Sequence, residues 1–381
     1  MNMEDRIQEF KDAAYAPKKL LKAHKAAGKK VIGVLPYFAP EELVYAAGMI
    51  PMGMWGTNTK TEKLSKEYCA SFYCTIAQLD LEMLLDGTMD ELDGVITPTC
   101  CDTLRPMSQN IRVAMSDKMP VIFLAHPQNR VPEYGIQFTI DQYTNVRKAL
   151  EKIAGHEMTD DDILEAIKLC NRTRTLQLQF SKLAGQHPDL ISAVARSAVF
   201  KAGRFMDKHV YNEKLAELNK ELEAAPVKPW NGVKVLTSGI ICDNPSLLQI
   251  FDDNHIAIVA DDVAHESRQI HSNAPEDTVN PMRALAEQFA NQDYDVLLYD
   301  KFSDQNRRGE YVAQLAKESG AQGVIVFMQT FCDPEEMEYP YLKKALDNAH
   351  IPHIKLGIDM QMRDFGQAST AIEAFADVLN V

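Results

Sequence analysis

The sequence predicts an α/β protein with two doubly wound parallel-sheet domains and a helical connector between them. Short Val- and Ile-rich runs alternate with helical stretches in both halves of the chain, which is typical of parallel strands covered by helices on both faces. No strand signal interrupts residues 159–225. The 381 residues exceed the size of one typical core. We therefore expect an N-terminal α/β domain at 1–158, a helical connector at 159–230 and a C-terminal α/β domain at 231–381.

The N-terminal half begins with about thirty residues rich in Ala and Lys, which predict one helix. Pro40 starts a second helix, because proline favours the first helical position, and Gly48 ends it. Two more helices are expected, from about Cys69 to Leu85 and over Tyr143–Ile153. The strands expected between them are four buried apolar runs, Val31–Phe38, Ile50–Trp55, Gly94–Pro98 and Val121–Ala125.

The connector and the C-terminal half follow from the same signals. Thr159 precedes three aspartates and an apolar periodic run, which is a good helix start. Pro226 and Pro229 end the helical stretch, and the turn at Asn231 leads into a new strand. The expected strands are Val233–Thr237, Ile256–Ala260, Val296–Tyr299, Val324–Met328 and Ile354–Ile358. The expected helices are Pro245–Asp253, Pro281–Asn291, Arg308–Ser319, Glu335–Asn348 and Ala368–Leu379.

The charge balance and the N-terminal segment limit the partners and the location. The net charge is -14, and an acidic surface repels the phosphate backbone of nucleic acids. The N-terminus is acidic and lacks the basic start and apolar core of a signal peptide, and no window is long and apolar enough to span a bilayer. We expect a cytoplasmic protein without nucleic-acid or membrane partners. In a reducing compartment its seven cysteines are buried, reactive or metal-bound rather than paired in disulfides.

Several motifs that would indicate a common chemistry are missing from the sequence. It contains neither a G-x-G-x-x-G after a strand nor a Walker A loop, so binding of a nucleotide by either loop is unsupported. His265-Glu266 does not extend into H-E-x-x-H, and there is no G-x-S-x-G. No C-x-x-C occurs, which excludes the usual zinc-ribbon and ferredoxin spacings.

Three cysteine positions coincide with places where parallel sheets present ligands. Cys100 and Cys101 follow the strand Gly94–Pro98, Cys332 follows the strand Val324–Met328, and Cys74 lies near the start of a helix. Ligands bind beyond the carboxyl ends of such strands, and three thiolates between two lobes suit an iron–sulfur cluster. From spacing alone, small buried hydrophobic cysteines are an equally good interpretation. Cys170, in the helical connector, and Cys242, in a loop, are interpreted as structural.

Together with these cysteines, six segments resemble a known family, the 2-hydroxyacyl-CoA dehydratases and the related benzoyl-CoA reductase subunits. The last segment is especially similar to the smaller (beta) subunit of the 2-hydroxyglutaryl-CoA type. The resemblance implies a [4Fe–4S] cluster held between the lobes by Cys74, Cys101 and Cys332, with Cys69 and Cys100 as alternates. The segments are Val31–Gly56, Phe72–Gly87, Asp93–Arg105, His126–Arg130, Ile258–Gln269 and Phe327–Pro340.

The resemblance also implies a function and partners. The chain would be the beta subunit of an oxygen-sensitive hydro-lyase that removes water from an (R)-2-hydroxyacyl-CoA to give a 2-enoyl-CoA, as in anaerobic amino-acid fermentation. The family's route is a ketyl radical formed after ATP-driven one-electron activation. The implied partners are a homologous larger (alpha) subunit, an ATP-dependent iron–sulfur activator protein and the acyl-CoA substrate. A flavin is compatible with the resemblance, but no motif in the sequence supports one.

Three alternatives stay open at this point. A benzoyl-CoA reductase-type subunit would use the same cluster to reduce an aromatic ring. A non-catalytic iron–sulfur protein would only relay electrons. In a metal-free α/β enzyme the cysteines would be coincidental. The sequence assigns no catalytic residue in any of these cases.

Other polar residues near strand ends and helix starts are better explained by structure than by chemistry. His126 and Arg130 could contact a CoA phosphate or the cluster environment, but the turn at Pro127 favours a capped loop. Asp261 and Asp262 end a strand, where capping is the favoured interpretation. We expect Arg268 and His271 to pair with such carboxylates. We also expect four glutamates to lie in the first turn of a helix, where the helix dipole favours acidic side chains. They are Glu41, Glu42, Glu335 and Glu336.

Overall fold

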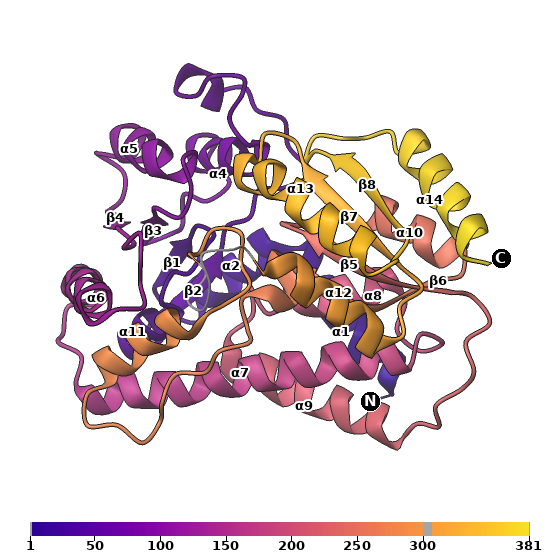
Figure 1. The fold of residues 1–381 in the computed structure, drawn as a ribbon. Helices are drawn as coiled ribbons and strands as arrows, with labels where there is room; N and C mark the ends of the chain where they lie inside the picture. The colour runs from indigo at the N-terminus through magenta and orange to yellow at the C-terminus, as the bar shows by residue number, and fades with distance from the viewer. Residues whose placement is uncertain (1, 300–306, 381) are drawn as a thin grey trace.

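The computed structural model describes residues 2–299 and 307–380. It contains two four-stranded, all-parallel sheets flanked by helices (Figure 1). The first sheet has the order β2-β1-β3-β4 and the second the order β6-β5-β7-β8, so the two lobes share one topology. The predicted α/β class is confirmed. The strands are β1 Val31–Val34, β2 Ile50–Gly53, β3 Gly94–Pro98, β4 Val121–Leu124, β5 Val233–Gly239, β6 Ile256–Val263, β7 Gly323–Gln329 and β8 His353–Ile358.

Each sheet is organised around a central strand. In the first lobe β1 pairs with β2 and β3, with Val31 opposite Ile50 and Ile32 opposite Gly94. In the second lobe β5 pairs with β6 and β7. All residues of β3 and β7 are buried, as expected for strands between two helical layers. The carboxyl ends of β3 and β7 occupy equivalent positions in the two sheets.

The N-terminal helices differ from the expectation at one point. The first thirty residues form two helices rather than one, because Ala16 leaves the helical conformation and Pro17, which has no N–H to donate, starts the second. These helices are α1 Met3–Tyr15 and α2 Pro17–Ala26. The others of this lobe are α3 Glu41–Ala46, the 3-10 turn Ser65–Glu67, α4 Thr75–Leu85, α5 Leu104–Ala114 and α6 Glu133–Ala154.

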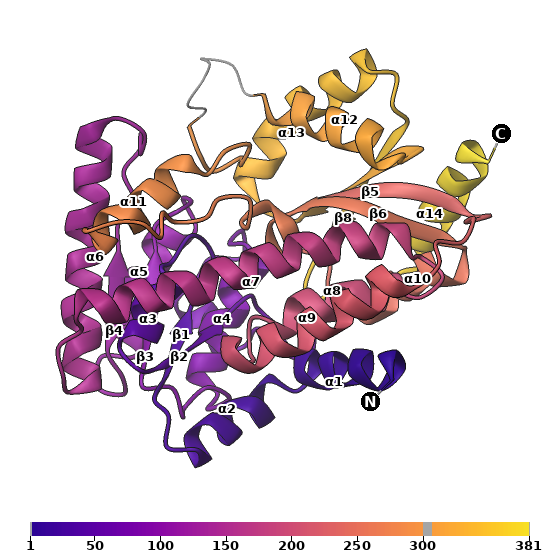
Figure 2. The same ribbon diagram turned by 90° about the horizontal axis from the view of Figure 1, so that it is seen from below.

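The predicted helical connector consists of three helices that brace both lobes. Thr159 and Asp162 form a reciprocal capping box that starts the long helix α7. This helix runs beneath both lobes (Figure 2) and packs against α3 in the first lobe and β6 in the second. Its contact with β6 is close, since a Cβ on Gly185 would lie 2.2 Å from the carbonyl oxygen of Val259. The connector helices are α7 Asp160–Gln186, α8 Ala193–Ala202 and α9 Lys208–Ala224.

The C-terminal half has five α-helices and one short π-helix among its described residues. Although α11 follows β6 in sequence, it packs against α6 of the first lobe. The two lobes therefore interlock. Among the described residues, no helix has the length and apolar character needed to cross a membrane. The helices are α10 Pro245–Asp253, the π-helix Ala264–Arg268, α11 Pro281–Asn291, α12 Arg308–Ser319, α13 Asp333–Asn348 and α14 Gly366–Leu379.

The strand predicted at Val296–Tyr299 was wrong. The backbone turns there instead, because the Asp295 side chain accepts a hydrogen bond from the N–H of Leu297 at 2.9 Å and its carbonyl accepts one from Leu298 at 3.0 Å. Tyr294, just before, has a positive φ of 54°. An aspartate that bonds its own backbone two residues on favours a turn over a strand. The apolar side chains of this segment therefore do not enter a sheet.

Candidate functional site

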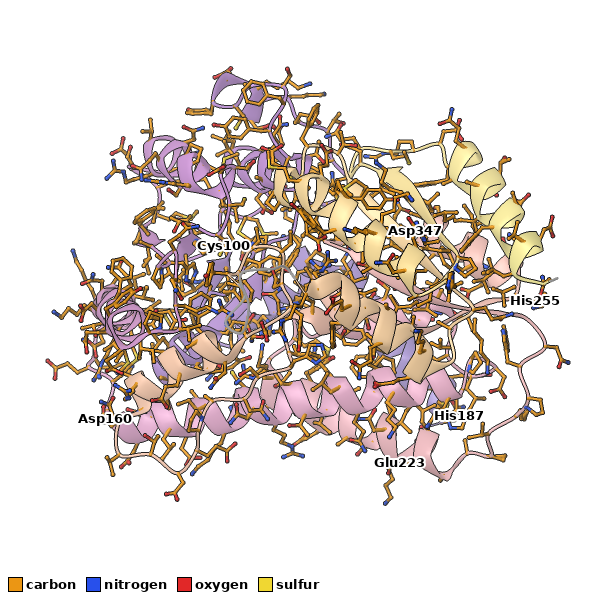
Figure 3. All side chains as sticks on the ribbon, in the orientation of Figure 1. Cys100, Asp160, His187, Glu223, His255 and Asp347 are labelled. Atoms are coloured by element: carbon orange, nitrogen blue, oxygen red, sulfur yellow. The ribbon has the colours of Figure 1, made fainter. Side chains whose placement is uncertain are left out.

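A cavity of about 170 Å³ lies between the carboxyl ends of the two sheets and is lined by residues of both lobes. Cys74, Cys101 and Cys332 all line it. The side chains at the junction of the lobes are densely packed, and Cys100 lies among them near the middle of the molecule (Figure 3). The structure thus brings the three predicted cysteines to one place. The rest of the wall is mostly apolar and includes Trp55, Ile76, Ile240, Leu297, Phe331 and Met337.

Each of the three thiols lies at the start of a helix. Cys74 is the N-cap of α4, and Cys332 is the N-cap of α13. Cys101 precedes α5, and its Sγ accepts a hydrogen bond from the N–H of Leu104 at 3.4 Å. The free N–H groups and the positive end of the helix dipole at these positions favour a thiolate over a thiol. The helix starts therefore favour the anionic form of all three sulfurs.

Burial of the three thiols opposes this effect of the helix starts. It raises the pKa of Cys74 to about 12 and also raises the pKa values of Cys101 and Cys332, while nearby backbone N–H groups lower all three. Negative charges on neighbouring thiolates repel one another, so Cys101 raises the pKa of Cys74, and both raise the pKa of Cys332. Three close thiolates in an apolar wall need a strong positive charge between them. A group containing several iron ions supplies such a charge and prefers soft sulfur ligands.

The three cysteines share one cavity, but the structure does not arrange them as a metal site. Within residues 2–299 and 307–380, no group of three or more His, Cys, Asp or Glu side chains is arranged to hold a metal ion. Cysteines that ligate an iron–sulfur cubane each bind a different iron, so they do not converge on one point. Three cysteines around one apolar cavity are consistent with that arrangement.

The two lobes carry the same four-residue pattern, Thr-x-Cys-Asp, after equivalent strands. It begins at Thr99 after β3 and at Thr330 after β7. The N–H of Thr99 donates to the carbonyl of Leu124 at 3.0 Å, and the N–H of Thr330 donates to that of Ile358 at 2.9 Å. Both acceptors are the last residues of the neighbouring strands β4 and β8. The repeated pairing places the second and third cysteines at matching positions in the two lobes.

The alternate cysteines point elsewhere. The Sγ of Cys100 donates to the carbonyl oxygen of Tyr37 at 3.0 Å, and Cys100 does not line the cavity. Cys69 is buried in the core of the first lobe with its Sγ 3.8 Å from the Sδ of Met107. Cys170 and Cys242 are buried in other parts of the structure. The geometry therefore favours Cys74 and Cys101 over their alternates, while the ligand assignment stays a prediction.

Comparison with known proteins decides the family. Residues 36–379 match the family described as 2-hydroxyglutaryl-CoA dehydratase, D-component. The chain belongs to this family. The (R)-2-hydroxyglutaryl-CoA dehydratase subunit beta of Acidaminococcus fermentans is 61% identical over 373 residues, 98% of each chain. The (R)-phenyllactyl-CoA dehydratase beta subunit of Clostridium sporogenes is 42% identical over 99% of this chain and 100% of its own, and the lactoyl-CoA dehydratase subunit beta of Anaerotignum propionicum is 35% identical over 98% of each.

The family predicted from the sequence is thus confirmed. The structure also shows contacts near the cavity between residues that the sequence had not singled out. Tyr37 lines the cavity, and its hydroxyl donates to the buried carboxylate of Asp295 at 2.7 Å. The Nε2 of Gln329 donates to the Oγ1 of Thr75 at 3.0 Å, and that hydroxyl donates to Asp359 at 3.2 Å. Each of these bonds joins segments more than 250 residues apart. No local motif predicts such pairs.

The structure agrees with the interpretation of His126 and Arg130 as residues of a loop. The buried guanidinium of Arg130 donates to the carbonyls of Phe289 at 3.2 Å, Tyr299 at 2.6 Å and Gln292. The ring of His126 packs on Phe289 at 4.7 Å, and burial lowers the pKa of His126 to about 4. Neither residue lines the cysteine cavity. Arg130 instead fixes the segment that follows α11.

The remaining polar predictions were confirmed in part. Asp261 was expected to cap a helix start. Its carboxylate accepts from the N–H of Ser267 at 3.0 Å inside the π-helix and pairs with Arg196, but the N-cap of that helix, Val263, has no side-chain cap. His271 was expected to pair with a carboxylate, but its Nε2 lies 3.4 Å from the hydroxyl of Tyr311 instead. Asp262 was also expected to cap, but its carboxylate pairs with the buried Arg268 and Arg308 instead, and the pairing expected for Arg268 is confirmed. All four predicted helix acids occupy first turns, Glu41 and Glu42 in α3, and Glu335 and Glu336 in α13.

Proposed function

We propose that the chain is the beta subunit of a 2-hydroxyacyl-CoA dehydratase, which eliminates water from an (R)-2-hydroxyacyl-CoA to give a 2-enoyl-CoA. The observation that carries the proposal is the meeting of Cys74, Cys101 and Cys332, from two lobes, around one apolar cavity. Family membership supports the reaction class. A 2-hydroxyglutaryl-type substrate is the first candidate, because the relative of that name is 61% identical over nearly the whole chain.

The three cysteines would hold a [4Fe–4S] cluster. When bound, such a cluster supplies single electrons at low potential and an iron without a cysteine ligand that can act as a Lewis acid. The chain's own residues exclude water from the thiols, through Trp55, Ile76 and Leu297, and direct the backbone N–H of Leu104 at the sulfur of Cys101. Burial and hydrogen bonds to sulfur are the features by which a protein sets the potential of a cluster.

One-electron chemistry suits this elimination, because the hydrogen lost from the β-carbon of a 2-hydroxyacyl thioester is not acidic. We propose the ketyl-radical route after ATP-driven activation. ATP hydrolysis is assigned in this proposal to a separate activator protein, in agreement with the lack of a Walker A loop in the sequence. A homologous alpha subunit, that activator and an acyl-CoA are the proposed partners. No flavin is included in the proposal, because no flavin-binding motif occurs in the sequence.

Two other functions make different predictions for the same preparation. A benzoyl-CoA reductase-type subunit would reduce an aromatic ring, and an electron-relay protein would turn over no acyl-CoA. The three relatives described above are all named as dehydratase beta subunits, which favours dehydration.

The test is an anaerobic assay of this chain purified with its alpha subunit and the activator. The substrates are (R)-2-hydroxyglutaryl-CoA, (R)-phenyllactyl-CoA, (R)-lactoyl-CoA and benzoyl-CoA, each with and without ATP. ATP-dependent formation of a 2-enoyl-CoA supports the proposal, and the preferred substrate identifies the acid. Turnover of benzoyl-CoA alone, or of none of the four, would refute it.

A further inference from the structure

A buried network of charged side chains lies directly behind Cys332 in the second lobe. Arg268, at the end of the π-helix, donates from Nη1 to Glu335 at 2.6 Å, from Nε to Asp262 at 3.2 Å and from Nη2 to the carbonyl of Gly239 at 3.0 Å. The side chains of Arg268, Asp262 and Glu335 are each 1% exposed. A desolvated arginine with this many partners has a fixed position, because breaking one contact leaves a buried charge unpaired.

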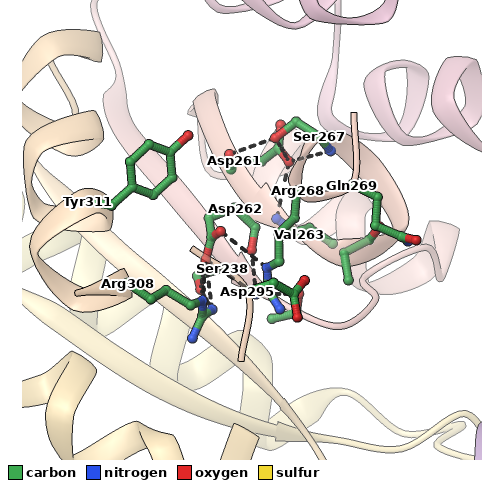
Figure 4. Close-up of polar contacts among 12 residues, drawn as sticks. Ser238, Asp261, Asp262, Val263, Ser267, Arg268, Gln269, Asp295, Arg308 and Tyr311 are labelled. Carbon is green, nitrogen blue, oxygen red and sulfur yellow. Dashed lines mark hydrogen bonds and ion pairs between the residues drawn. The ribbon is translucent and has the colours of Figure 1, made fainter. Parts of the chain in front are cut away.

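A second arginine completes the network. Arg308 donates to Asp262 at 2.7 Å, to Ser238 at 2.8 Å and to Glu338 at 2.6 Å. Asp262 therefore lies between two arginines (Figure 4). Since Arg308 begins α12 and Glu338 lies in α13, the network connects β5, β6, α12 and α13. It is a rigid support for the first turn of α13.

Glu335 connects this support to the thiol. Cys332 is the N-cap of α13, and Glu335 is the third residue of that helix. The backbone N–H of Glu336 donates to the carbonyl of Cys332 at 3.0 Å and closes the first turn of α13, and the intervening Pro334 has no N–H to offer. The side chain of Glu335 is held by Arg268, and its backbone belongs to the turn that closes on Cys332. Through these two contacts, the position of Arg268 constrains the position of Cys332.

The first lobe has the same motif without the charges. There the residue three positions after the cysteine is Leu104, which donates its N–H to the sulfur and packs in the apolar core. The Thr-x-Cys-Asp geometry can therefore be built without a buried ion pair. The second lobe places a carboxylate and a guanidinium beside its thiol in addition, where they act on its charge as well as on its position.

We propose that Arg268 and Glu335 are positioning residues for Cys332, which fix the helix turn that carries its sulfur and set the electrostatic field at the metal group that it would ligate. The electrostatic half of this inference rests on the proposed function, and the positioning half does not. Two substitutions separate the halves. Arg268→Lys keeps the positive charge but loses the planar fork. Glu335→Gln keeps a hydrogen-bond acceptor for Arg268 but removes the negative charge.

The positioning half is tested on cluster-free protein by the rate at which iodoacetamide alkylates Cys332, measured by mass spectrometry. Arg268→Lys should raise this rate about tenfold, because the first turn of α13 opens more often. Glu42→Gln is the matched control, since it removes the negative charge from another buried pair, Arg174–Glu42 at 2.8 Å, away from the cavity. A rate in Arg268→Lys no higher than in Glu42→Gln would overturn the positioning role.

The electrostatic half is tested on anaerobically purified protein by a redox titration monitored by electron paramagnetic resonance. Glu335→Gln should raise the midpoint potential above that of the wild type, because loss of a negative charge favours the reduced state, and Glu42→Gln should not. An unchanged or lower potential in Glu335→Gln would overturn this half. A wild-type chain without iron would refute the proposed function instead, and the alkylation assay would still decide the role of Arg268.

Discussion

Gln329 donates a hydrogen bond from its Nε2 to the Oγ1 of Thr75 at 3.0 Å, and this bond joins the two lobes beside the cysteine cavity. Thr75 directly follows Cys74, and Gln329 lies three residues before Cys332. Both side chains are buried. The bond therefore fixes the first cysteine relative to the third, although they belong to different lobes.

Thr75→Val is expected to weaken the junction of the lobes. It removes the hydroxyl but keeps the shape, so Gln329 loses its partner in the other lobe, at a cost of about 1–3 kcal/mol for a buried polar group. The melting temperature should fall and iron should be lost faster on exposure to chelator. Thr173→Val is the control, because its buried hydroxyl bonds only within α7, to Leu169 at 3.1 Å. Equal effects of the two substitutions would contradict a specific role for the inter-lobe bond.

Tyr37→Phe is expected to loosen the turn that covers the cavity. Without the hydroxyl, the buried Asp295 loses a 2.7 Å donor, which should cost about 1–3 kcal/mol. Amides of residues 293–299 should exchange hydrogen faster, while those of β3 should not change. Tyr211→Phe removes another buried hydroxyl, which donates to Val199 at 3.0 Å in the connector, and should leave exchange at 293–299 unaltered. Unchanged exchange there in Tyr37→Phe would show that the bond does not secure the turn.

Asp80 should make the protein less stable as the pH rises. Burial raises the pKa of this carboxyl from 3.8 to about 8, and one hydrogen bond from the N–H of Gly56 only partly opposes this. The folded protein thus keeps a proton that the unfolded chain releases above pH 3.8. The stability that this proton contributes is complete below the unfolded pKa and is lost as the pH rises toward 8.

Melting temperatures measured from pH 5 to pH 9 test this assignment. Asp80→Asn should remove part of the decline between pH 5 and pH 8, because an amide does not titrate. Asp86→Asn is the control, since the pKa of Asp86 is lowered beside Lys60 and this carboxylate is ionised in both states over that range. If Asp80→Asn and the wild type decline in parallel, Asp80 is not the titrating group.

The sequence predicted the fold because buried parallel strands are recognisable locally. The Val and Ile runs of β3 and β7 are fully buried, and the capping box at Thr159 started a helix as expected. The failure at Val296–Tyr299 has a local cause, because the carboxylate of Asp295 bonds the backbone of Leu297. An apolar run in the sequence does not show whether the side chain before it will bond the backbone and form a turn in place of a strand.

The site was only partly predictable. Cys101 and Cys332 could be placed because residues after parallel strands gather at one edge of a sheet. The residues that support these cysteines could not be predicted, because they come together only in the tertiary structure. Arg268 and Glu335 are 67 residues apart in sequence, and whether they meet depends on how β6 and α13 pack.

The most direct test of the account is the iron content of anaerobically purified cysteine variants. Cys101→Ala and Cys332→Ala should lose the cluster, with its broad absorbance near 400 nm and about four irons per chain. Cys170→Ala should keep both, because Cys170 is buried in α7 away from the cavity. Equal iron in all three variants would contradict the claim that thiols from both lobes hold one cluster.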